Sequence, residues 1–385
     1  SPEYLLVLPG INPLIPLWYG LLSLAIALIV HEGAHGVVAR AHQIKVKSLG
    51  LLLLVVPIGA FVEPDEEELE RAPTRAKNRV FAAGIMSNLV VAFLCAAAFS
   101  AAWGNVAVAH DGLAITSVVD GQGASLAGLQ PGMIITSLDG RQVRTADDFA
   151  SVINATHAGD TIAVGLWSQG EALERQVQLT DKYAYYARTN PQLNNETFRG
   201  KGFMGISSVP MAFFQFLRDL SADPAAQGTV GLGTYLLLPI PSIAGTGLSP
   251  LPADFEPLYT IGGLAAAIPA PVFWVTVNSL YWIFWLNLMV GTFNALPLGF
   301  LDGGQMFKAS LKGILRRKFG VARESLVVER LLGGKQIIVR GSDSATQAKV
   351  ERIDGLVRVA MLTTGLTILG MILVPIVGPH LARLI

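Results

Sequence analysis

The pentapeptide His31-Glu32-Gly33-Ala34-His35 contains the residues with the clearest chemical potential. On a helix, positions i and i+4 share a face, so both imidazoles can bind one metal ion. Glu32 lies about 100° around the helix, where it can contact a water molecule on that ion. The spacing therefore predicts a metal site for hydrolysis, with Glu32 as general base. The alternative is a helix end where these three side chains only satisfy one another.

A catalytic zinc site needs a third protein ligand and one open position. Cys95 is the only cysteine, which excludes a thiolate cluster and leaves histidines and carboxylates as ligands. Asp302 is the only acid between residues 257 and 323, and it follows a break rich in Pro and Gly after Asn294. We expect Asp302 to be the third ligand. It could instead only cap a helix that runs to Lys318.

The composition places these residues in a membrane. Charged residues make up only 15% of the 385 residues, and the mean hydropathy is +0.50, whereas soluble domains carry roughly 25% charge. Four segments without charge, 4–30, 80–109, 257–301 and 359–381, each reach the roughly 20 residues that span a bilayer. The sequence therefore predicts at least four helical spans, the first running to near Ala41.

The charges indicate sidedness and exclude one class of partner. Lys plus Arg and Asp plus Glu both number 28, so nothing indicates nucleic-acid binding. If the spans alternate, three basic clusters lie on one side, which the positive-inside rule makes cytoplasmic. The region 107–210 would then lie outside. The clusters are Arg40, Lys45 and Lys47; Arg71, Arg75, Lys77 and Arg79; and Lys308, Lys312, Arg316, Arg317 and Lys318.

The region 106–210 has soluble composition and short β-like runs at 113–119, 133–138, 161–167 and 175–179. With its Gln130-Pro131-Gly132 and Asp139-Gly140 turns it resembles a bacterial, circularly permuted PDZ domain. The resemblance implies that residues 111–115 form the carboxylate-binding loop and its strand, where a substrate C-terminus adds by β-augmentation. Gly112, Leu113 and Ile115 are the candidate contacts. The alternative is an unrelated β domain that acts only as a lid.

The segment 47–63 has an apolar core too short to span, broken by Pro57 and Gly59. It suits a re-entrant β hairpin whose edge could pair with a substrate strand. Gly59, Ala60 and Phe61 are the candidate substrate contacts. The alternative is a buried loop that only packs against the core. The Pro-rich stretch 224–253 suits a re-entrant or interfacial segment.

H-E-x-x-H on one span, N-x-x-P-x-x-x-x-D-G on a later one and a PDZ-like insert between them together resemble the site-2 protease family of intramembrane zinc metalloproteases. Gly84-Ile-Met-Ser-Asn88 is similar to the family's G-x-x-x-N motif. The resemblance implies a core of three helices and the hairpin described above.

The resemblance also implies the role of each site residue. His31, His35 and Asp302 would bind Zn²⁺, and Glu32 would be the general base. Asn294 would contact the substrate backbone or the developing oxyanion. Asn88, the last residue of the G-x-x-x-N motif, would contact the substrate.

We therefore expect a polytopic α-helical membrane protein with a three-helix catalytic core and an inserted small β-rich PDZ-like domain. Residues 1–105 would hold two spans, the H-E-x-x-H helix and the hairpin; 106–210 the extracytoplasmic domain; 211–320 a re-entrant segment and the third core span; and 321–385 a cytoplasmic loop and a C-terminal span.

The expected function is intramembrane zinc endopeptidase activity on membrane-anchored substrates, as in regulated intramembrane proteolysis. The expected place is the lipid bilayer of a prokaryotic cell membrane. The alternatives are a transporter or channel that uses the same His, Glu and Asp cluster, and an inactive scaffold that presents the PDZ-like domain. No inverted repeat is visible, which counts against a transporter, and the presence of Glu32 with all three ligands counts against a scaffold.

Overall fold

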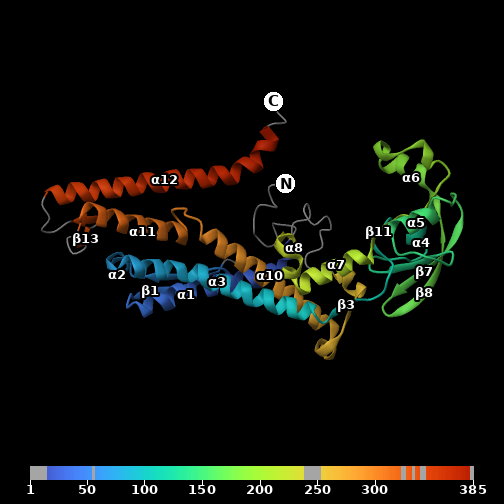
Figure 1. The fold of residues 1–385 in the computed structure, drawn as a ribbon, viewed down its shortest axis with the longest axis horizontal. Coiled ribbons are helices and arrows are strands. Elements are labelled where there is room, and N and C mark those ends of the chain that lie inside the picture. Colours follow the sequence, from blue (N-terminus) through green and yellow to red (C-terminus); the bar gives the residue numbers. More distant parts are fainter. Residues whose placement is uncertain are drawn as a thin grey trace. The chain divides into compact units, whose positions relative to one another are not determined.

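The computed structural model describes residues 15–53, 57–237, 253–321, 327–331, 334–338 and 344–381. These residues form two compact units, which are described separately. The motif unit consists of residues 16–95 and the chain from residue 282 onward, and the insert unit is formed chiefly by residues 96–281. Figure 1 shows the order of their elements along the chain.

Within the residues that the structure describes, four helices are long and apolar enough to cross a membrane. They are α1 (Leu17–Ala41), α3 (Thr74–Trp103), α10 (Ala270–Asn294), and residues Ser344–Met371 of α12 (Ser344–Leu381). α1 ends at Ala41, as the sequence predicts. α3 and α12 begin well before the uncharged segments that start at residues 80 and 359, because a helix can continue out of the bilayer through charged residues.

One face of α1 is buried, and the motif histidines lie on it. The buried residues recur every three or four positions, as expected for one side of a helix. Small side chains precede the histidines on this face, which allows close helix contacts. The buried residues are Gly20, Ser23, Ala27, His31, His35 and Ala39.

The predicted hairpin is present. Strands β1 (Val46–Leu53) and β2 (Pro57–Pro64) pair antiparallel, with Leu49 opposite Val62 and Leu51 opposite Ala60. The following short helix α2 (Glu66–Arg71) is capped by Asp65, whose side chain accepts a hydrogen bond from the Glu68 N–H. The hairpin therefore leads from the end of α1 towards the start of α3.

Helix α11 (Asp302–Phe319) packs against α12 in the motif unit. Their shared core contains Val321, Val350, Ile353 and Val357. Between these helices, β13 (Val327–Leu331) pairs with β14 (Gly334–Ile338).

The insert unit contains a sheet with strand order β11-β4-β5-β7-β8, and β6 pairs with β5. All four predicted β runs are strands of this sheet. Helix α4 (Gly123–Leu126) lies between β4 and β5 in the chain, and α5 (Ala146–Ile153) lies between β6 and β7. We call residues 106–210 the β domain. The strands of the sheet are β4 (Leu113–Val118), β5 (Ile134–Leu138), β6 (Arg141–Gln142), β7 (Thr161–Ser168), β8 (Glu171–Gln178) and β11 (Ile206–Pro210).

The sheet order corrects the expected peptide-binding strand. β4 has β11 on one side and β5 on the other, so its main chain offers no free edge. Leu113 and Ile115 are fully buried in the core of the domain, and a Cβ at Gly112 would meet the Ile135 backbone. Gly112, Leu113 and Ile115 therefore cannot form a peptide-binding edge. The strand at that end of the sheet is β11.

Smaller elements complete the β domain and the unit around it. Within the β domain, β9 (Thr180–Asp181) pairs with β10 (Gly202–Phe203), and α6 (Lys182–Thr189) is followed by the 3₁₀ turns η2 (Pro191–Leu193) and η3 (Glu196–Phe198). After it come α7 (Met211–Ala222), η4 (Pro224–Gln227), α8 (Gly228–Leu237), η5 (Ala253–Leu258), β12 (Tyr259–Ile261) and η6 (Gly263–Ala267). β12 pairs with β3 (Val106–Val108). Of the stretch 224–253, residues 238–252 lie outside the described residues.

Candidate metal centre

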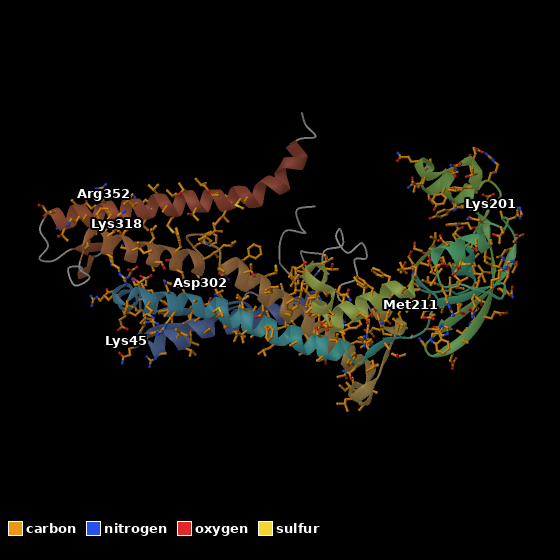
Figure 2. All side chains as sticks on the ribbon, in the orientation of Figure 1. Lys45, Lys201, Met211, Asp302, Lys318 and Arg352 are labelled. Atoms are coloured by element: carbon orange, nitrogen blue, oxygen red, sulfur yellow. The ribbon has the colours of Figure 1, made fainter. Side chains whose placement is uncertain are left out.

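The structure brings together His31, His35 and Asp302. The two histidines lie one turn apart on α1, and their rings meet edge to face at 83° with centroids 4.8 Å apart. Asp302, labelled in Figure 2, is the first residue of α11. Its Oδ2 lies 3.0 Å from His31 Nε2 and 3.2 Å from His35 Nε2. One atom from each side chain thus faces a common point.

This donor set fits a divalent cation. The three ligand atoms lie within 4.8 Å of one another. Among the described residues, Asp302 Oδ2 is buried and has no hydrogen-bond partner, despite the two nearby ring nitrogens. A buried carboxylate oxygen without a donor is costly. A cation held by two imidazoles and a carboxylate would remove this cost, and this ligand chemistry suits zinc.

The hydrogen bond of His35 fixes its tautomer for metal binding. His35 Nδ1 lies 2.7 Å from the carbonyl oxygen of Val80 on α3. Because a carbonyl only accepts, Nδ1 must carry the proton and donate it. Nε2 then keeps its lone pair on the side of Asp302, as in metal sites whose histidines are oriented by an outer hydrogen bond.

Asn88 contacts the other histidine, His31. It lies on α3, is fully buried, and its side-chain amide is 3.4 Å from His31 Nδ1. Within the described part of the chain its Oδ1 has no partner. The amide oxygen and nitrogen exchange places by a rotation that leaves the shape unchanged. With its oxygen towards His31, Asn88 would accept a hydrogen bond from His31 Nδ1–H and leave Nε2 free for the metal. The structure thus places Asn88 beside a candidate ligand, and a substrate contact stays a prediction.

Gly84 allows α3 to approach the two histidines. A Cβ at this position would lie 2.5 Å from His35 Nε2 and 2.7 Å from His31 Nε2. Any side chain here would therefore push the imidazoles out of place. The Ser87 hydroxyl is 2.9 Å from the Gly84 carbonyl and 3.3 Å from the Val30 carbonyl, which joins α3 to α1 beside the site.

The break between α10 and α11 positions Asp302. Gly303 and Gly304 are buried against the carbonyls of Ala295 and Leu298, where a Cβ would collide with the backbone. This close approach is possible only for glycine. The N-cap position is taken by Leu301, and no side chain caps the helix. Capping therefore does not account for Asp302, whose carboxylate faces the histidines.

Glu32 follows His31 on α1 and contacts the hairpin. Its carboxylate accepts a hydrogen bond of 3.1 Å from the backbone N–H of Val62 on β2. Val62 therefore points its backbone groups away from β1. Because this orientation alternates along an antiparallel strand, Ala60 also faces the free side of β2, whereas Gly59 and Phe61 face β1. Of the three predicted contacts on the hairpin, only Ala60 can offer main-chain groups to a substrate strand.

Asn294 is not joined to the metal ligands by a described contact. It is the last residue of α10, and its amide donates a hydrogen bond of 3.0 Å to the Val290 carbonyl in the same helix. Its expected role at the substrate backbone or oxyanion stays a prediction.

Sequence reasoning missed four features of the structure. It did not identify the Val80 carbonyl or the Val62 N–H, because backbone groups have no residue-type signal. It noted Gly84 only as part of a motif, without its contact to both imidazoles. The strand β11, which has two serines and ends in Pro210, has too weak a β pattern to be noticed.

The family model described as Peptidase family M50 matches residues 19–331, which include the candidate metal centre, Glu32 and Asn294. Metalloprotease MmpA from Caulobacter vibrioides is 26% identical over 365 residues, covering 78% of this chain and 88% of that protein. Zinc metalloprotease RasP from Shouchella clausii is 21% identical over 276 residues, covering 70% of this chain and 59% of RasP.

Two further similarities say less about chemistry. Uncharacterized protein MJ0971 from Methanocaldococcus jannaschii is 21% identical over 332 residues, covering 84% of this chain and 67% of that protein. The PDZ domain of an SdrC-like protein from Listeria monocytogenes is 23% identical, with a TM-score of 0.21, and the match covers 26% of this chain and 90% of that domain.

Proposed function

The chain belongs to peptidase family M50, the site-2 protease family of membrane-embedded zinc metalloproteases, and from this premise we propose that it hydrolyses peptide bonds in or near the transmembrane segments of membrane-anchored proteins. The observation that carries the proposal is the convergence of His31, His35 and Asp302 next to Glu32. Family membership favours this activity over the transporter, channel and scaffold alternatives.

We assign the zinc to His31 Nε2, His35 Nε2 and Asp302 Oδ2. Zinc bound there supplies the Lewis acidity that polarises the scissile carbonyl. Glu32 takes a proton from the attacking water and gives it to the leaving amine. Val80 and Asn88 keep the two imidazoles oriented throughout, because each contacts the ring nitrogen that does not face Asp302.

The free side of β2 is the proposed substrate-binding edge. A peptide bond inside a helix has its carbonyl hydrogen-bonded and its faces covered by side chains, so a substrate must be extended before attack. Ala60 and Val62 can pair with such an extended segment by β-augmentation. Since the Val62 N–H already contacts Glu32, a strand added here would lie beside the general base.

The β domain is proposed to select substrates from the extracytoplasmic side. Its terminal strand β11 and the preceding residues 203–205, with Gly205 at φ +81°, are the proposed site for a substrate C-terminus. The orientation follows from the basic clusters of the motif unit. In a Cys95→Ala background, cysteines at Asp147 and Arg317, both exposed, should label from opposite sides of the membrane.

Glu32→Gln tests the proposed activity. Purified wild type should cleave a model transmembrane peptide, and the variant should lose about 10²- to 10⁴-fold in kcat/KM because it lacks a general base. Metal analysis should find one zinc in both proteins. Glu171→Gln, an exposed carboxylate on β8, serves as the charge-matched control and should cleave normally. Turnover by Glu32→Gln close to that of wild type would refute the mechanism.

A further inference from the structure

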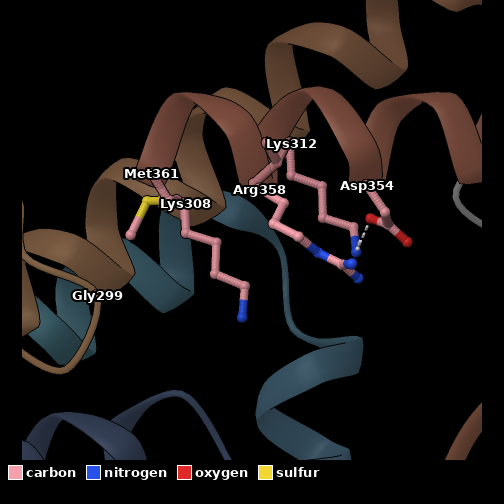
Figure 3. A pocket seen from close by; sticks show the side chains of 7 residues that line it. Gly299, Lys308, Lys312, Asp354, Arg358 and Met361 are labelled. Carbon is pink, nitrogen blue, oxygen red and sulfur yellow. Dashed lines mark ion pairs between the residues drawn. The ribbon is translucent and has the colours of Figure 1, made fainter. Parts of the chain in front are cut away.

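A cavity of about 420 Å³ lies between α11 and α12 in the motif unit. Figure 3 shows side chains from both helices that line it. Val357 and Met361 give it an apolar part, next to Gly299. The remaining lining residues are charged: Lys308 and Lys312 on α11, and Asp354 and Arg358 on α12. The cavity thus combines an apolar wall with a strongly basic one.

The charges that line the cavity are not balanced. Lys312 Nζ forms an ion pair of 2.7 Å with Asp354 Oδ1, drawn as a dashed line in Figure 3. Lys308 and Arg358 are exposed, and among the side chains that the structure describes neither has an ion-pair partner. Lys308 and Arg358 therefore face this cavity without an ion-paired carboxylate among the described side chains.

A neighbouring acid does not offset them. Glu70 on α2 is bonded to Lys77 at 3.1 Å. Burial acts most strongly on the pKa of Glu70 and would raise it, but Lys77, helped by the fields of Lys312 and Lys308, holds this pKa below its ordinary value. Glu70 is therefore ionised and already paired, and it leaves the local excess of positive charge in place.

The cavity lies where α12 changes from a charged to an apolar surface. Beyond Arg358, the helix exposes Val359, Leu362 and Leu366 at 60%, 60% and 68% of their full surface. Apolar side chains so exposed on a membrane-spanning helix face acyl chains. A molecule bound in the cavity could therefore contact cations at one end and the apolar surface of α12 at the other.

We propose that this cavity binds a phosphate-bearing anion, and that its source is the headgroup of an anionic membrane lipid. Arg358 can donate two parallel hydrogen bonds to phosphate oxygens, and Lys308 adds a compact positive charge. The acyl chains would follow the exposed apolar surface of α12. Basic pockets between helices on the cytoplasmic side of a membrane are suited to such headgroups.

The test compares two double variants with the same change in charge. Lys308→Gln/Arg358→Gln removes the two cations that lack a partner in the cavity. Arg317→Gln/Lys318→Gln removes two exposed cations of α11 that do not line it. Native mass spectrometry of the full chain, titrated with phosphatidylglycerol and with phosphatidylcholine, measures the affinity for each lipid.

Wild type and the Arg317/Lys318 control should bind phosphatidylglycerol more tightly than phosphatidylcholine. The Lys308/Arg358 variant should lose at least tenfold in affinity for phosphatidylglycerol while keeping its zinc, which reports that the motif unit is folded. Equal losses in both double variants would show a general surface effect and overturn the proposal. Displacement of the lipid by inorganic phosphate at a similar concentration would overturn the lipid as the source.

Discussion

The carboxylate of Glu32 on α1 accepts a hydrogen bond of 3.1 Å from the backbone N–H of Val62 on β2. The residue proposed to move protons is therefore in direct contact with the strand proposed to bind the substrate. A substrate strand added to β2 would compete for this N–H and release the carboxylate. Binding and activation of the general base would then occur in the same step.

Ala60→Pro tests the binding edge. Proline removes the outward N–H of Ala60 without touching the β1–β2 ladder. Loss of one hydrogen bond, about 0.5–1.5 kcal/mol, should lower kcat/KM by roughly two- to thirteenfold while zinc content stays unchanged. Leu49→Pro, at an outward position of β1, is the matched control and should cleave normally. Similar losses in both variants would argue against β2 as the substrate edge.

Loss of a metal ligand should abolish zinc binding and cleavage together. His31→Ala and Asp302→Ala should each lower zinc affinity by more than about 100-fold, because even the partners of metal ligands contribute 10- to 100-fold. His42→Ala, at the C-cap of α1 and outside the site, is the control. Atomic emission gives zinc per chain, and circular dichroism reports helix content. Full zinc occupancy in Asp302→Ala would show that another residue is the third ligand.

Gly84→Ala should damage the site without unfolding the helix. Alanine favours a helix over glycine by about 1 kcal/mol, but its Cβ would lie 2.5 Å from His35 Nε2. We expect the imidazoles to turn away and zinc affinity to fall about 10- to 100-fold. Gly355→Ala on α12 meets no atom within 4 Å and should be neutral. If Gly84→Ala binds zinc like wild type, the close approach has no role in metal binding.

A photo-crosslinking residue at Ser207 should capture a peptide that binds the β domain. Ser207 is exposed on the terminal strand β11, and Glu174 is exposed on β8 at the opposite end of the sheet, where it serves as the control. A peptide with a free C-terminus should crosslink at Ser207 more strongly than its amide. Leu113→Asp should instead unfold the domain, because it buries a charge in the core. Crosslinking at Glu174 alone would place the site on β8.

Much of the metal site could be predicted because its signals are local. The i, i+4 spacing places His31 and His35 on one face of α1, and the absence of any other acid between residues 257 and 323 singles out Asp302. The hairpin was predictable for the same reason, since Pro57 and Gly59 interrupt a short apolar run. Each of these inferences needs only the residue types of one segment and the spacing between them.

The neighbours of a strand could not be predicted in this way. Alternating side chains show which face of β4 is buried, but not that β11, almost 90 residues later, covers its edge. The contacts of Val80 and Gly84 with the histidines likewise depend on how closely α3 approaches α1. Such pairings are properties of the folded chain and leave no periodic signal in either segment.

The short ladder between β3 and β12 has a mechanical consequence. β3 follows the end of α3, and β12 comes shortly before the start of α10, so the ladder ties together one end of each of two spans. Arg218 strengthens this end by donating a hydrogen bond of 2.6 Å to the Val106 carbonyl. Any motion that separates these two helix ends would therefore have to break the β3–β12 pairs.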